Sequence, residues 1–101
     1  VLLPSVLEFT GPAVPEKINK IAKLITIKNS DKNTSRNIAY AIKQLCDDIS
    51  IPPLRSLIDN PDFFKSSLNK MAQDAIDSGS VANNPMPATN EQIMKLYLQI
   101  I

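Results

Sequence analysis

The sequence predicts an all-α protein of about five helices. Apolar residues recur at helical spacing in several segments, and no segment alternates apolar and polar residues over the length of a strand. The eight prolines and two glycines fall at the boundaries of these segments, where they interrupt the helices least. Each predicted helix carries one apolar stripe and must bury it against the other helices or against something that this chain lacks. We therefore expect residues 1–101 to form a single all-helical domain.

The first two helices are short. Residues Val1–Phe9 are predicted to form an apolar helix, because proline is tolerated in a first turn, where Pro4 lies, and residues 10–12 (Thr-Gly-Pro) close it. A second helix begins near Pro15, with the carboxylate of Glu16 at its positive end. One apolar face of this helix contains Ile18, Ile21, Ala22 and Ile25. The polar residues 29–33 are predicted to be a loop.

The third helix has the clearest pattern. Thr34 or Ser35 supplies a side chain suited to the N-cap, and residues 52–53 (Pro-Pro) end the helix. Residues 54–58 are predicted to form a single turn. The apolar stripe of the third helix consists of Ile38, Ala41, Ile42, Leu45, Cys46 and Ile49.

Two further helices follow. Asn60 is suited to cap the fourth, Pro61 to begin it, and Gly79 to end it in the left-handed conformation. Thr89 and Gln92 have the spacing of a capping box for the fifth. The stripe of the fourth helix is Phe64, Leu68, Met71, Ala72, Ala75 and Ile76, and that of the fifth is Ile93, Leu96, Tyr97 and Ile100. Ile42 and Leu68 are predicted to be core residues at facing helix positions.

Composition excludes several classes of function. Apolar residues make up 44% and charged residues 21%, which is typical of a globular protein. The net charge of +1 gives no electrostatic footprint for nucleic acid or an anionic membrane as partner. No apolar run reaches the roughly 18 residues of a transmembrane helix. One cysteine, Cys46, excludes an internal disulfide and indicates a reducing, cytoplasmic environment. The apolar start without an initiator methionine indicates a segment excised from a longer protein.

The residues themselves predict no catalytic, cofactor-binding or metal-binding site in this chain. There is no histidine, and the adjacent carboxylates Asp47 and Asp48 point to different sides of a helix, as expected of a solvated surface. Cys46 falls on an apolar stripe, which favours a structural thiol over a nucleophile. A lysine stripe is better explained as a solvated helix face than as a phosphate site: Lys17, Lys20, Lys23, Lys28 and Lys32. Residues 80–87 fit either an ordered loop that lines a site or a plain connector, and the residues alone favour the connector.

The order of these local signals resembles that of the iron-containing alcohol dehydrogenases. Residues 1–9 (VLLPSVLEF) are similar to the family's LLPHV-x-x-F-N segment, and residues 41–52 to an A-I-x-x-L helix that ends in I-G-I-P. Leu54 and Leu57 lie where the family has a short turn, and residues 71–75 resemble its next helix. Residues 84–97 are similar to N-P-R-x-x-T-x-x-x-I-x-x-L-Y. The chain departs from the pattern at Ser5, Thr10, Ser50 and Met86, where the family has histidine, asparagine, glycine and arginine.

The resemblance implies the C-terminal helical domain of a dehydroquinate-synthase-like, iron-containing alcohol dehydrogenase fold. In such enzymes an N-terminal α/β domain binds NAD or NADP, and one aspartate and three histidines that precede the LLPHV segment hold Fe²⁺ or, in some members, Zn²⁺. The metal polarises the substrate oxygen, and hydride passes between the nicotinamide and a small alcohol or aldehyde. The resemblance therefore implies an NAD(P)-dependent parent oxidoreductase, a homo-oligomer. It also implies that this segment depends on the remainder of its own polypeptide and is inactive alone.

Two residues of the segment are expected to touch substrate in the parent enzyme. Counting back from residues 84–85 (Asn-Pro), Ser80 falls where some relatives carry a pocket-lining cysteine, and Val81 is adjacent. A different class of function stays open, in which the chain is a freestanding helical module that binds a partner helix in a groove. A helix-turn-helix DNA-binding protein fits less well because of the balanced charge.

Overall fold

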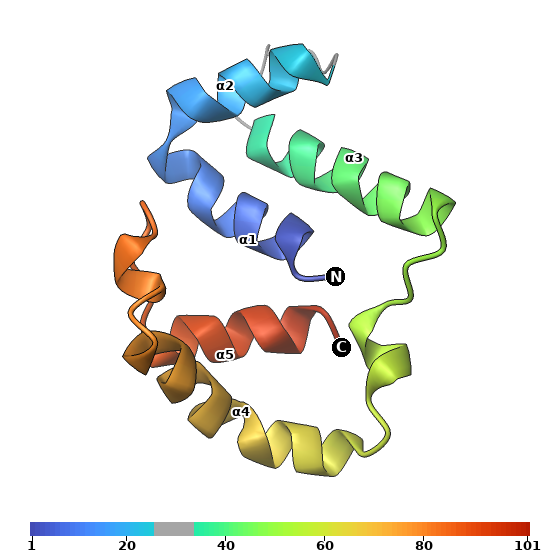
Figure 1. Ribbon diagram of the computed structural model, residues 1–101, viewed down its shortest axis with the longest axis vertical. Helices are drawn as coiled ribbons and strands as arrows, with labels where there is room; N and C mark the ends of the chain where they lie inside the picture. The colour runs from blue at the N-terminus through green and yellow to red at the C-terminus, as the bar shows by residue number, and fades with distance from the viewer. Residues whose placement is uncertain (26–33) are drawn as a thin grey trace. The chain divides into compact units, whose positions relative to one another are not determined.

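The computed structural model describes residues 1–25 and 34–101, and every regular element in them is helical, which confirms the predicted all-α fold (Figure 1). The α-helices are α1 (Leu3–Thr10), α2 (Pro15–Leu24), α3 (Thr34–Asp48), α4 (Pro61–Asp77) and α5 (Asn90–Gln99). The 3₁₀ turns are η1 (Gly11–Ala13), η2 (Leu54–Leu57) and η3 (Val81–Asn83). The chain divides into two compact units, Val1–Ile51 and Pro52–Ile101. The single domain expected over residues 1–101 stays a prediction.

The first unit is built on the packing of α1 and α2 against α3. Ile18 and Ala22 of α2 and Ile38 of α3 are buried together, and the partly buried Leu7, Val14 and Ile42 pack against them. At the surface, Arg36 Nε donates to Glu8 Oε1 at 2.9 Å and so joins α3 to α1. Both charged side chains are exposed, so the ion pair contributes at most about 1 kcal/mol. The apolar cluster therefore supplies most of this unit's stability.

The predicted stripes are buried over only part of their length. On α2, Ile18 and Ala22 are buried, whereas Ile21 and Ile25 are exposed. On α3, Ile38 is fully buried and Ala39, rather than the predicted Ala41, is buried beside it. Leu45 and Ile49, at the far end of the same stripe, are 56% and 59% exposed. Periodicity identifies the apolar face of a helix, but the length of the neighbouring helix decides how much of that face is covered.

The N-cap predicted at Thr34 or Ser35 was wrong, because α3 already includes both residues: it begins at the buried Thr34. The residue that precedes the helix lies outside the described residues. The loop predicted at 29–33, and Lys28 and Lys32 of the lysine stripe, also lie outside them.

The third helix ends in a Schellman motif. The N–H of Ser50 donates to the carbonyl of Asp47 at 3.0 Å, and the N–H of Ile51 donates to that of Cys46 at 2.8 Å. Ser50 has φ of 60°, the left-handed region that glycine adopts without steric cost. Gly79, which follows α4, has φ of 80° and confirms the predicted left-handed end of that helix. Ser50 therefore occupies a position suited to glycine and stores strain there.

Replacing Ser50 with glycine is expected to stabilise the chain by about 1 kcal/mol, because the left-handed backbone costs a non-glycine residue roughly 1–2 kcal/mol. Denaturant melts measure this change. Gly79→Ala provides the reverse control, since a Cβ at Gly79 meets no atom within 4 Å and only the backbone angle penalises it. If Ser50→Gly lowers the unfolding midpoint, the Ser50 side chain contributes more than its backbone strain costs.

The second unit consists of α4 packed against α5, with η2 preceding them. Leu68 and Ala72 of α4 and Ile93 of α5 are buried, and the rings of Phe64 and Tyr97 meet edge to face with centroids 6.3 Å apart. The core position predicted for Leu68 is thereby confirmed. Ile42, predicted to face it, belongs to the first unit and is only partly buried.

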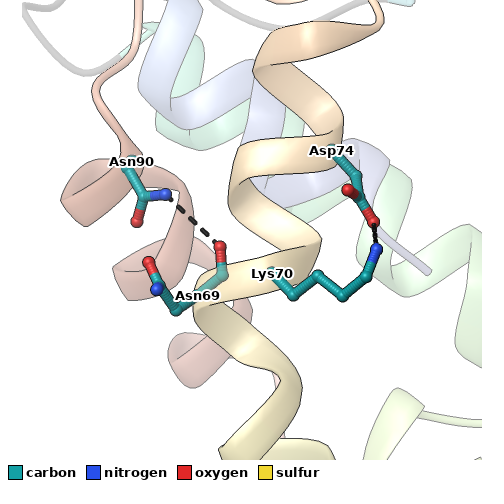
Figure 2. Close-up of polar contacts among 4 residues, drawn as sticks. All are labelled: Asn69, Lys70, Asp74 and Asn90. Carbon is teal, nitrogen blue, oxygen red and sulfur yellow. Dashed lines mark hydrogen bonds and ion pairs between the residues drawn. The ribbon is translucent and has the colours of Figure 1, made fainter.

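Both helices of the second unit begin as predicted. The Asn60 side chain accepts from the N–H of Phe63 at 3.0 Å, and Thr89 and Gln92 form the complete capping box. Directly after this cap, Asn90 Nδ2 donates to the carbonyl of Asn69 at 3.3 Å, which fixes the start of α5 against the middle of α4 (Figure 2). Among the described residues, no helix has the length and apolar character needed to cross a membrane.

Candidate functional site

The two predicted pocket residues lie in the connection between α4 and α5. Ser80 is exposed and precedes η3; its N–H donates to Ser78 Oγ at 3.3 Å, and its carbonyl accepts from Asn83 at 3.2 Å. Val81 is partly buried as the first residue of η3, and its carbonyl accepts from the N–H of Asn84 at 3.1 Å. Ser80, with its hydroxyl, and Val81, with its isopropyl group, are thus adjacent residues of one hydrogen-bonded turn.

Asn84 holds the second half of this connection. It is partly buried, and its Nδ2 donates to the carbonyl of Met86 at 2.7 Å. The connection is thus fixed by its own hydrogen bonds between the left-handed Gly79 and the capping box at Thr89. An ordered loop between two well-capped helices is a suitable support for residues that contact a ligand.

The described residues do not supply the donors of an iron site. The whole chain lacks histidine. Over residues 1–25 and 34–101, no group of three or more cysteine, aspartate or glutamate side chains is placed to hold a metal ion. Two of the acids are paired with lysines one turn away on their own helices: Lys43 with Asp47 at 3.4 Å, and Lys70 with Asp74 (Figure 2). Iron prefers imidazole and carboxylate ligands that converge on one point, so this donor set does not fit it.

The other candidates for chemistry, Cys46 and the lysine stripe, are distant from this loop in the sequence. Cys46 is partly buried on α3, and Lys17, Lys20 and Lys23 are exposed on α2. The periodicity did not predict the large exposed apolar surface of the first unit. A signal for it is present in the sequence, because the fifteen-residue α3 carries an apolar stripe longer than the eight-residue α1 that packs on it.

Comparison with known proteins identifies the family. The model of the C-terminal region of the Fe-containing alcohol dehydrogenase family matches residues 1–101. The chain is 33% identical to lactaldehyde reductase of Escherichia coli strain K12 and also to that of Escherichia coli O157:H7, over 96% of this chain. It spans 25% of the length of these curated relatives. No solved structure gives a significant match. The chain therefore belongs to the Fe-containing alcohol dehydrogenase family and matches its C-terminal region.

Proposed function

We propose that this chain is the C-terminal helical part of an NAD(P)-dependent, iron-activated alcohol dehydrogenase. The parent oxidoreductase interconverts small alcohols with aldehydes or ketones by hydride transfer. The observation that carries the proposal is the family match over residues 1–101, together with 33% identity to a lactaldehyde reductase. The rival hypothesis, a freestanding module that binds a partner helix, is not favoured by these comparisons. We further propose that the parent is a cytoplasmic homo-oligomer.

In this proposal the remainder of the polypeptide holds the metal, iron or zinc, and the dinucleotide. The residues of this chain form a packed helical wall that excludes water from the reacting groups. The absence of histidine and the lack of a fitting donor set among the described residues support this division of roles.

The test is to express the full-length protein, load it with Fe²⁺ or with Zn²⁺, and follow the oxidation of NADH and NADPH with short aldehydes, lactaldehyde among them. Turnover that depends on both the metal and the nucleotide supports the proposal. Loaded, folded protein that turns over no aldehyde and no alcohol would contradict it.

The isolated residues 1–101 are expected to retain no tightly bound divalent metal and to oxidise no alcohol. Three or four well-placed ligands are needed to hold iron or zinc, and this chain contains no histidine. The measurement is metal analysis after the protein has been equilibrated with Fe²⁺ or Zn²⁺ and dialysed. About one metal ion retained per chain would show that the ligands lie within this segment.

We propose that Ser80 and Val81 border the substrate pocket of the parent enzyme. Two observations support this. The turn is closed by backbone hydrogen bonds, so the loop is ordered, and Ser80 is exposed. A small hydroxyl leaves room and polarity next to a substrate, whereas an aromatic ring in the same place fills that space.

Ser80→Phe in the full-length enzyme is therefore expected to lower kcat/KM for longer alcohols by about 10-fold or more, since one methylene of misfit in a pocket already costs roughly 10–200-fold. Steady-state kinetics across a series of short and long alcohols measures this. Ser66→Phe makes the same replacement at an exposed site on α4, and Lys70→Ala alters an exposed surface charge. An unchanged kcat/KM for every alcohol would show that the loop does not contact substrate.

A further inference from the structure

The segment that joins η3 to α5 has few backbone donors of its own. Residues 84–87 are Asn-Pro-Met-Pro, and neither Pro85 nor Pro87 carries a backbone N–H. Met86 lies between them and is partly buried, so its carbonyl needs a donor from the protein. That donor is a side chain: Nδ2 of Asn84 donates to the Met86 carbonyl oxygen at 2.7 Å. The Asn84 amide therefore takes the place of a backbone N–H in this segment.

Asn84 also connects this segment to the turn that contains Ser80 and Val81. Its backbone N–H donates to the carbonyl of Val81 at 3.1 Å, and the N–H of Asn83 donates to that of Ser80 at 3.2 Å. The backbone at Asn84 is extended, with φ of −78° and ψ of 137°, as expected of a residue that precedes proline. One residue thus bonds to the turn through its backbone and to the Met86 carbonyl through its side chain.

The far end of this segment is fixed as well. Pro85 and Pro87 each hold φ at about −65°, which leaves the stretch between them few conformations. Two residues after Pro87, the capping box at Thr89 holds the start of α5. All of these residues belong to the second unit, so the placement of the turn follows from contacts within that unit. The side-chain hydrogen bond of Asn84 is therefore a link between the start of α5 and the turn at residues 80–81.

We propose that Asn84 is a positioning residue for the substrate pocket, which acts through Ser80 and Val81 and sets the preference of the parent enzyme for the length of its alcohol. This inference rests on the proposed function, in which those two residues border the pocket. The Asn84 amide holds the turn in one place, so an alcohol long enough to reach the turn meets a fixed wall. A turn without this hydrogen bond moves, and such an alcohol loses contacts that a shorter one never makes.

Asn84→Asp in the full-length enzyme tests the proposal, because aspartate keeps the size of the side chain and loses its donor. The matched control is Asn83→Asp, which adds the same charge at the neighbouring, exposed residue. For the longest alcohol that the native enzyme accepts, we expect Asn84→Asp to lower kcat/KM by about 10-fold, within the roughly 100-fold that a misplacement of about 1 Å can cost. The shortest alcohols are expected to keep their native kcat/KM, and the control is expected to keep it for every alcohol.

Amide hydrogen exchange of the same full-length proteins gives a measurement that does not need activity. In the peptide that covers residues 80–84, we expect exchange in Asn84→Asp to be about 5-fold faster than in native protein, the factor that one hydrogen bond of ordinary net strength contributes. Asn83→Asp is expected to leave the opening of the turn unchanged. If Asn84→Asp does not fold, Asn84→Ala removes the same donor without adding charge.

Two results overturn the inference. One is equal exchange in the two variants. The other is a loss of kcat by the same factor for every alcohol with KM unchanged, which is the result expected of a variant that only folds less well. A folded native enzyme that turns over no alcohol would refute the proposed function, and the substrate role of Asn84 with it. An active native enzyme whose two variants share its alcohol preference would refute the positioning role alone.

Discussion

Truncating Ile38 to alanine is expected to destabilise the 101-residue chain by about 2–5 kcal/mol, the cost typical of emptying a buried position of this size. Ile38 has no exposed surface and is buried in one cluster with Ile18 and Ala22, so the lost methyl and methylene groups leave a cavity that these neighbours cannot fill without moving. The loss is a large share of the roughly 5–15 kcal/mol that stabilises a typical domain.

Denaturant melts measure the effect, and Leu45→Ala is the matched control on the same stripe. Leu45 is 56% exposed in this chain, so its truncation is expected to change the free energy of unfolding by about 0.5 kcal/mol or less. Equal losses for Ile38→Ala and Leu45→Ala would show that the buried and exposed halves of the stripe have been misassigned.

Replacing Gly11 with alanine is the second change with a large expected effect, about 1–3 kcal/mol of destabilisation from overpacking. Gly11 is buried where η1 meets the start of α3, and an added Cβ would lie 2.5 Å from the Cβ of Ser35 and in direct overlap with its hydroxyl oxygen. The Cβ of Ser35 is bonded directly to the backbone of α3 and cannot rotate away, so η1 and α3 must move apart to admit the new methyl group. The backbone conformation of Gly11 does not disfavour alanine, because its φ of −52° and ψ of −42° are helical angles that alanine adopts readily.

A double-mutant cycle isolates this contact. Ser35→Gly removes the two atoms closest to the new Cβ and leaves only Ile18 Cδ1 near it, at 3.3 Å, so Gly11→Ala is expected to cost much less in the Ser35→Gly background than in the native chain. The four proteins are compared by their free energies of unfolding. The same loss in both backgrounds would mean that Gly11 is required for a reason other than its approach to Ser35.

The candidate site could be predicted from the sequence only as far as its local structure. The boundaries of the connection, Gly79 and Thr89, and its cap were predictable because each depends on a few neighbouring residues. Whether Ser80 and Val81 face a substrate depends on the rest of the enzyme, so this role stays a prediction. The prediction that this chain supplies no metal ligand rests on composition, since a chain without histidine offers no imidazole, and it stays a prediction.

The sequence by itself determined where α2, α4 and α5 begin. It did not determine every end, because α3 stops at Asp48 in the Schellman motif around Ser50, before the predicted residues 52–53. Pro15, Pro61, Asn60 and the pair Thr89 and Gln92 act within one turn of the backbone, and the structure has the helix starts where they predict them. Only the tertiary structure decided which apolar residues are buried. Ile38 and Ile49 belong to one periodic stripe, yet the first is fully buried and the second is 59% exposed. The difference arises because α1 extends along only part of α3, and burial depends on the length and register of the neighbouring helix, which no local pattern encodes.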